Sequence, residues 1–162
     1  MFLTSISSNG ESFGLYKASE TDALPIVELM ANDPLRQGDY PEPSENFQAY
    51  IQAFRAIDTD PAQLLVAVKD SRHKLVATMQ LTIIPGLSRG GSTRMLIEAV
   101  RVDASLRGKG IGSSMIVWAV AEAKRRGASL VQLTSDNTRT RAHQFYEKLG
   151  FTASHIGFKL QV

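Results

Sequence analysis

The chain has 162 residues, 43% hydrophobic and 21% charged with a net charge of +2, a composition typical of a soluble globular protein that can bury a core. It has no cysteine, which excludes disulfides, thiolate metal sites and a cysteine nucleophile, and its three scattered histidines show no metal-ligand spacing. No apolar run approaches the roughly 20 residues of a membrane span and the N-terminus shows no secretory signal, so we expect one cytoplasmic domain over residues 1–162.

The first part of the chain predicts one strand, two helices and a long loop. Residues 14–20 read as a strand, and Thr21 and Asp22 can cap a helix after it. Residues 32–46 contain three prolines and a glycine, which indicates a loop long enough to be functional. Ser44 can cap a second helix, whose apolar positions are Phe47, Tyr50, Ile51 and Phe54.

The remainder alternates strands with helices. The predicted strands are residues 63–70, 74–84, 94–102 and 130–134, and the predicted helices are residues 110–126 and 138–150. Residues 151–162 alternate apolar and other residues, which predicts a last strand. The expected order is therefore β-α-α-β-β-β-α-β-α-β(β).

A glycine-rich turn joins the strand at 94–102 to the next helix, with the sequence RGKGIG over residues 107–112. The first turn of a helix presents unpaired backbone N–H groups and a partial positive charge, which suit a phosphate. A tight turn that needs glycine for geometry alone is the other interpretation. The spacing does not fit a dinucleotide fingerprint, and a Walker loop is absent.

Charge is distributed unevenly along the chain. Residues 1–80 hold 6 Lys/Arg and 11 Asp/Glu, whereas residues 81–162 hold 12 and 5. The uneven distribution has two interpretations. It can arise by chance from charged residues on solvated faces, or it can mean that the C-terminal half binds an anionic ligand. The basic residues do not form a dense run with exposed aromatics, so we expect no nucleic-acid surface.

Two motifs occur in order along the second half of the chain. The first is R-x-x-G-x-G at Arg107, Gly110 and Gly112, within residues 97–112. The second lies in residues 135–151, where Asn137 precedes Ala142, Phe145, Tyr146, Gly150 and Phe151. Together they resemble the GNAT superfamily of acetyl-CoA-dependent N-acetyltransferases. The resemblance implies an α/β (α+β) fold with a mixed, mostly antiparallel sheet flanked by helices, acetyl-CoA as co-substrate and no metal.

The resemblance also implies which residues meet acetyl-CoA. The pantetheine arm would add to the strand edge at Val100, Arg101 and Val102, and Asn137 would line the thioester end. The pyrophosphate would meet the backbone of the turn and helix start, formed by Arg107, Gly108, Lys109, Gly110, Ile111, Gly112 and Ser113.

Acetyl transfer to an amine needs a base, a stabilised oxyanion and a proton for the leaving thiolate. The family pattern makes Tyr146 the candidate acid, and the backbone N–H around Val100 the candidate oxyanion donor. Glu98 is the candidate base, directly or through water; its alternative is a place on the solvent face of the strand. Burial would raise its pKa toward a useful range. His143 and His155 are rival bases.

In this superfamily the first helices and their loop form much of the acceptor pocket. Residues 33–45 hold four acidic residues and one basic residue, a balance that would favour a cationic amine, while Arg36 could hold a carboxylate or phosphonate. Residues 133–160 also resemble the aminoalkylphosphonate acetyltransferases. We expect a small-molecule amine acceptor, with exposed strand edges that would allow a homodimer. The alternative function is a non-catalytic acyl-CoA-binding sensor with the same fold.

Overall fold

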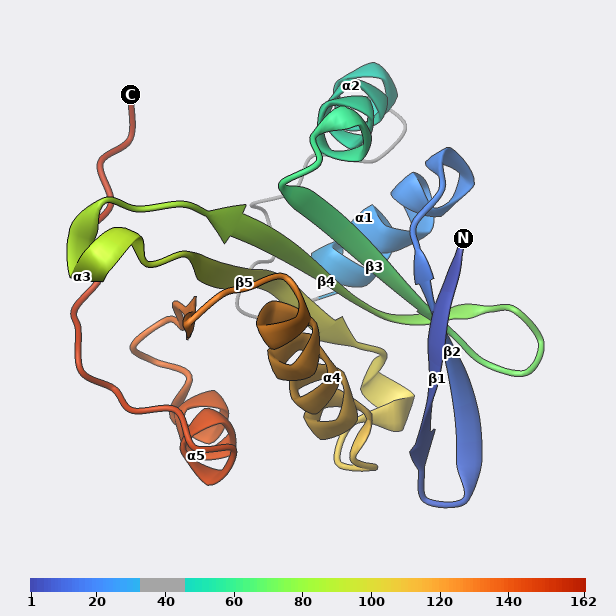
Figure 1. Ribbon diagram of the computed structural model, residues 1–162. Helices are drawn as coiled ribbons and strands as arrows, with labels where there is room; N and C mark the ends of the chain where they lie inside the picture. The colour runs from blue at the N-terminus through green and yellow to red at the C-terminus, as the bar shows by residue number, and fades with distance from the viewer. Residues whose placement is uncertain (33–45) are drawn as a thin grey trace.

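The computed structural model describes residues 1–32 and 46–162. The predicted acceptor loop, including Arg36 and the Ser44 cap, therefore lies outside the described residues. The rest of the fold is built on one twisted sheet with helices on both faces (Figure 1).

The sheet has six strands that follow the chain from one edge to the other (Figure 1). They are β1 (Phe2–Ser8), β2 (Glu11–Lys17), β3 (Gln63–Lys69), β4 (Leu75–Ile84), β5 (Arg94–Val102) and β6 (Leu130–Leu133). Neighbours from β1 to β5 are antiparallel, and β5 and β6 are parallel. The predicted fold class, a mixed and mostly antiparallel sheet with flanking helices, is confirmed.

The helices lie on the two faces of this sheet. They are α1 (Ala23–Ala31), α2 (Phe47–Thr59), α3 (Ser88–Gly91), α4 (Ile111–Arg125) and α5 (Thr140–Lys148), with the 3-10 turns η1 (Glu20–Asp22) and η3 (Ala104–Leu106). Within the described ranges, no helix is long and apolar enough to cross a membrane. A cytoplasmic location stays a prediction.

Two apolar clusters fix the helices to opposite faces. One joins the α4 side of the sheet to Ile111, Met115 and Ile116 of α4, and the other joins the opposite face to α1 and α2. Strand β3 serves both, because Leu64 and Val66 belong to the first cluster while Leu65 belongs to the second. A strand covered on both faces reads as a continuous apolar run, as residues 64–68 do.

The N-terminus adds a strand that the sequence prediction missed. Residues 2–8 form β1, and the strand predicted at 14–20 runs instead over Glu11–Lys17. The two strands are joined by Asn9 and Gly10, whose φ angles are 48° and 80°. Asn-Gly is the sequence signature of a two-residue type I′ hairpin, so this hairpin could have been predicted.

The C-terminus lacks the strand that was predicted there. Residues 151–162 have no regular secondary structure, which corrects the last element of the expected order. An alternating sequence forms a strand only when a neighbouring strand supplies backbone partners. This tail leads away from α5 and ends clear of the sheet (Figure 1).

Candidate active site

Strand β5 is interrupted by a β-bulge in its middle. Gln80 of β4 pairs with Glu98, but Thr78 pairs with Arg101, so two residues of β5 oppose the single Met79. Ala99 takes a φ of 51°, which is unusual for a residue other than glycine. The bulge re-aims the backbone of the segment predicted to carry the oxyanion donor at Val100.

Beyond the bulge, β5 and β6 part. Their parallel pairing runs from Arg94 with Leu130 to Ile97 with Leu133. In the described part of the chain, residues 98–102 have no strand partner on the β6 side. This leaves a strand edge at the predicted place for an extended pantetheine arm. The Val100 and Val102 carbonyls accept hydrogen bonds from the side chains of Arg101 at 2.8 Å and Arg107 at 3.2 Å.

The glycine-rich turn delivers the chain from β5 to the start of α4. Gly110 occupies the N-cap with a φ of 89°, and the first helical bond runs from the Ser114 N–H to the Gly110 carbonyl at 3.0 Å. The N–H groups of Ile111 to Ser113 therefore have no acceptor inside the helix. The first turn contains no acidic residue, and Arg107 and Lys109 are exposed beside it. The electrostatics suit an anion.

Strand β1 braces this turn from the side. The Ser8 hydroxyl donates to the Lys109 carbonyl, and the Ser114 hydroxyl donates to the Ser7 carbonyl at 3.4 Å. A Cβ on Gly110 would lie 3.0 Å from the Ser8 Oγ. Glycine at 110 is thus required both by its positive φ and by the close approach of β1.

Gly112 has a different role from Gly110. A Cβ there would lie 3.5 Å from the Phe145 ring on α5. That distance is an ordinary van der Waals contact, so the first turn of α4 packs against α5 here without requiring glycine. The two predicted motifs, which are distant in sequence, therefore touch at this point.

Tyr146 follows Phe145 on α5 and packs at its edge, with ring centroids 5.0 Å apart, while Phe151 lies 5.8 Å away on another side. Burial raises the pKa of Tyr146, and the positive charges of Arg101 and Arg139 offset only part of that rise. The phenol therefore keeps its proton at neutral pH, as a general acid must. Sequence reasoning did not foresee the proximity of Arg139, because nothing in its local pattern distinguishes it.

Glu98 is exposed, so the burial considered for it at the sequence level is absent. Met95 and Ile97 point into the cluster under α4, which places Glu98 on the opposite face, the one that carries α1 and α2. Its cross-strand partner Gln80 donates to Gln63 at 3.0 Å. Glu98 therefore belongs to a polar row across three strands, including Gln80 and Gln63, which sequence reasoning missed.

The remaining candidates lie around α5 and the tail. Asn137 is exposed in the turn before α5, and no described contact fixes a role for its side chain. A ring nitrogen of His143 lies 2.8 Å from the Asp136 carbonyl, a contact that ties α5 to this turn. His155 lies in the tail and pairs with the Ser154 hydroxyl at 2.8 Å, so it begins no strand.

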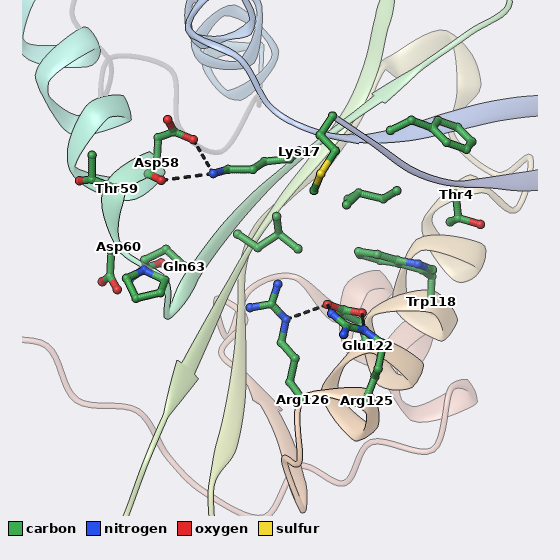
Figure 2. Close-up of a pocket in the computed structure, with 15 residues that line it drawn as sticks. Thr4, Lys17, Asp58, Thr59, Asp60, Gln63, Trp118, Glu122, Arg125 and Arg126 are labelled. Atoms are coloured by element: carbon green, nitrogen blue, oxygen red, sulfur yellow. Dashed lines mark hydrogen bonds and ion pairs between the residues drawn. The ribbon is translucent and has the colours of Figure 1, made fainter.

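A cavity of about 740 Å³ lies away from these residues (Figure 2). It is lined by the last turns of α4, the end of α2 and the start of β1, and none of the predicted site residues reaches it. Its charged groups already pair, as Lys17 with Asp58 at 2.7 Å and Arg126 with Glu122 at 2.7 Å. We therefore place the candidate site at the β5 opening and not in this cavity.

Comparison with known proteins decides the family. The model of the acetyltransferase (GNAT) family matches residues 27–151, which contain the bulge, the turn and α5. The chain belongs to the GNAT acetyltransferase family. Within the described residues of this GNAT protein, no three His, Asp or Glu gather as metal ligands.

The chain is similar in sequence to two N-acetyltransferases and in fold to a solved structure. An aminoalkylphosphonate N-acetyltransferase of Salmonella typhimurium is 39% identical over 62 residues, and a glucosamine 6-phosphate N-acetyltransferase of Trypanosoma brucei brucei is 35% identical over 89 residues. These matches cover 38% and 55% of this chain, and 40% and 58% of the relatives. A crystal structure described as a transcriptional regulator from Bacillus halodurans C-125 is 37% identical, with a TM-score of 0.88 over 93% of this chain and 99% of that one.

Proposed function

We propose that this GNAT protein transfers the acetyl group of acetyl-CoA to the primary amine of a small molecule, by direct attack in a ternary complex. The observation that carries the proposal is the opening of β5 from β6 beside the N-terminus of α4. This opening offers a strand edge without a neighbouring strand next to an anion site, and Tyr146 of α5 lies close enough to Arg101 of β5 to feel its charge. An acylated, phosphate-bearing thioester would use all three features.

In the proposed complex, the first-turn N–H groups of α4 bind the pyrophosphate, with Arg107 and Lys109 adding charge. Residues Val100 to Val102 hold the pantetheine arm as a neighbouring strand would. The Val100 N–H, re-aimed by the bulge, donates to the carbonyl oxygen of the thioester as that oxygen becomes negative. Asn137 lies at the thioester end by its place in the family pattern.

Two side chains handle the protons. As the amine nitrogen bonds to the acetyl carbon and the C–S bond breaks, Tyr146 gives its phenolic proton to the departing sulfur. Glu98 takes the proton that the amine loses, directly or through water. Its exposure on the α1 and α2 face fits this role, because acceptor and pyrophosphate then enter from opposite faces of the sheet.

The two N-acetyltransferase relatives named above suggest the chemical class of the acceptor. Both are named for amines that also carry a phosphonate or phosphate group. We therefore propose an acceptor of this kind, a small primary amine with an anionic phosphorus group. A panel that pairs each phosphorylated amine with its unphosphorylated counterpart tests this point.

The experiment measures release of CoA thiol from acetyl-CoA with this amine panel. The chain has no cysteine of its own, so every thiol detected comes from CoA. Tyr146→Phe should lower the turnover number by about 100-fold or more, because it removes the general acid. The control is Tyr16→Phe, a tyrosine of β2 near Phe2 and His73 at the far end of the sheet, which should keep full activity.

The second candidate is a binding module that senses acyl-CoA. It is favoured by the description of the Bacillus halodurans structure as a transcriptional regulator. Tight binding of acetyl-CoA with no thiol release for any amine would support it over the enzyme. Absence of binding would contradict both functions.

A further inference from the structure

The cavity of Figure 2 lies beside the last turns of α4, at the opposite end of this helix from the proposed pyrophosphate site. Its volume of about 740 Å³ is within the range of small-molecule sites. One part of its wall is apolar, because Leu3 of β1, Leu64 of β3 and Trp118 of α4 line it and all belong to the cluster under α4. Another part, formed by the last turn of α4, is charged.

The charge on the α4 wall is a carboxylate shared by two arginines. Glu122 is 9% exposed and accepts hydrogen bonds from Arg125 at 2.7 and 2.6 Å and from the Nε of Arg126 at 2.7 Å. The hydrogen bond from Arg125 outweighs burial and, with that from Arg126, lowers the pKa of Glu122, so this carboxyl is ionised at neutral pH. Two positive charges therefore face one negative charge on this wall.

Arg126 has hydrogen-bond donors that its own chain does not use. Its side chain is 24% exposed, and among the described residues only its Nε has a partner. Figure 2 shows the guanidinium pointing from α4 into the cavity. A mostly covered cation with unused N–H groups is stabilised when an anion binds to it. The C-terminus of α4 does not need this arginine for its dipole, because Lys124 and Arg125 lie in the same turn.

The opposite wall leaves room for a negative charge at Arg126. Lys17 is paired with Asp58 at 2.7 Å, so these two residues add no net charge. Asp60 is exposed and accepts the N–H of Ala62 at 2.8 Å. Because Asp60 lies in water, salt and solvent screen its repulsion for an anion on the α4 wall. The cavity therefore combines one available cation with an apolar surface.

We propose that this cavity binds a small monocarboxylate with an apolar body, of the kind represented by a short fatty acid. The two Nη groups of Arg126 form a planar pair of donors that matches the two oxygens of a carboxylate. The apolar body then lies against Trp118 and Leu64. A phosphate dianion fits less well, since only one positive charge is in surplus. None of the residues proposed for acetyl transfer lines this site.

Trp118 reports binding directly, because the chain has a single tryptophan. Sodium hexanoate is the probe, with 1-hexanol as the control that lacks the charge and acetate as the control that lacks the apolar chain. Hexanoate should change the emission of Trp118 saturably with a dissociation constant below about 10 mM, and both controls should bind at least about 10-fold more weakly. The absence of a saturable change, or equal binding of 1-hexanol, would overturn the proposal.

A matched pair of variants tests the role of Arg126. Arg126→Gln removes the unused donors but keeps the pair of Arg125 with Glu122, and should weaken hexanoate binding about 10-fold or more. Lys124→Gln removes the same charge from the same turn, but Lys124 is exposed and does not line the cavity, so this variant should bind hexanoate normally. Equal losses in both variants would mean that long-range attraction alone draws the anion, and would contradict the site.

Arg126→Lys guards against misfolding of the glutamine variant, because it keeps the positive charge beside Glu122. It lacks the planar pair of donors and should also bind hexanoate more weakly than the wild type. Full affinity in this variant would contradict the bidentate contact. All of these titrations are made without acetyl-CoA, so their failure is distinct from failure of the proposed acetyl transfer.

Discussion

The two ends of the sheet are built for different tasks. From β1 to β4 each strand pairs with the next, and residues such as Leu15, Val66 and Met79 are completely buried. At the β5–β6 end the strands part after four paired positions, and neither β6 nor α5 contains a buried residue. The candidate site lies at this second end. Burial is therefore concentrated in β1 to β4, which leaves backbone at the β5–β6 end available to a ligand.

A matched pair of leucine substitutions gives the most direct test of this difference in burial between the two ends of the sheet. Leu81 in β4 is 1% exposed, whereas Leu130 in β6 is 41% exposed. Leu81→Ala should lower the free energy of unfolding by about 2–5 kcal/mol because it leaves a cavity, while Leu130→Ala should lower it by less than about 1 kcal/mol. Urea titration measures both.

Equal losses for the two leucines would refute the contrast between the two ends. A loss of unfolding free energy in Leu130→Ala that grows with protein concentration would instead mean that a second copy of the chain covers β6.

The turn before α4 should matter for binding more than for stability. Gly110→Asp introduces strain at a φ of 89°, a clash with Ser8 and a negative charge at the proposed pyrophosphate site. We expect the dissociation constant for CoA to rise about 100-fold, measured by calorimetry.

Gly127→Asp is the matched control for this variant. Gly127 has a φ of 76° and open space around its Cα, but it follows the opposite end of α4. It should lose similar stability, about 1–2 kcal/mol, and bind CoA normally. Unchanged affinity in Gly110→Asp would remove the pyrophosphate assignment.

The stability of the β1–β4 end of the sheet should fall in acid because of Asp22. This carboxylate is 6% exposed, and burial alone would raise its pKa. Hydrogen bonds from Lys69 and Ser19 outweigh burial and hold the pKa below its usual value; the distances are 2.7 Å to Lys69 Nζ, 2.9 Å to the Ser19 N–H and 2.7 Å to the Ser19 hydroxyl. A lowered pKa means that Asp22 stabilises the fold above about pH 4 and loses this contribution as the pH falls through its folded-state pKa.

Asp22→Asn should therefore cost about 1–3 kcal/mol at pH 7, and the gap to the wild type should close in acid. The control is Asp58→Asn, whose pair with Lys17 is exposed, with 42% and 36% of the two side chains accessible. This variant should lose less than about 1 kcal/mol. A constant gap between wild type and Asp22→Asn at all pH values would exclude the ion pair as its cause.

Sequence patterns predicted the β1–β4 end of the sheet better than the β5–β6 end. The strands at 63–70, 74–84 and 94–102 were found because burial on one or both faces leaves a readable apolar pattern. The helix after RGKGIG was found for the same reason. The hairpin at Asn9 and Gly10 carried a signal that was overlooked.

The bulge and the parting of β5 from β6 could not be predicted in the same way. Ala99 takes a positive φ because of how β5 pairs with Met79 and its neighbours in β4, and nothing in its own identity favours that conformation. The approach of Arg101 and Arg139 to Tyr146 likewise depends on the packing of separate elements. Only the two family motifs indicated where the site would lie.

The extra residue in β5 also shifts the phase of the strand. Before the bulge the odd-numbered Met95 and Ile97 enter the cluster under α4, and after it the even-numbered Val100 and Val102 pack there. Without the bulge, strict alternation would turn Ala99 and Arg101 toward that cluster in place of Val100 and Val102. The bulge keeps an apolar half-strand and a ligand-facing half-strand in one continuous segment of chain.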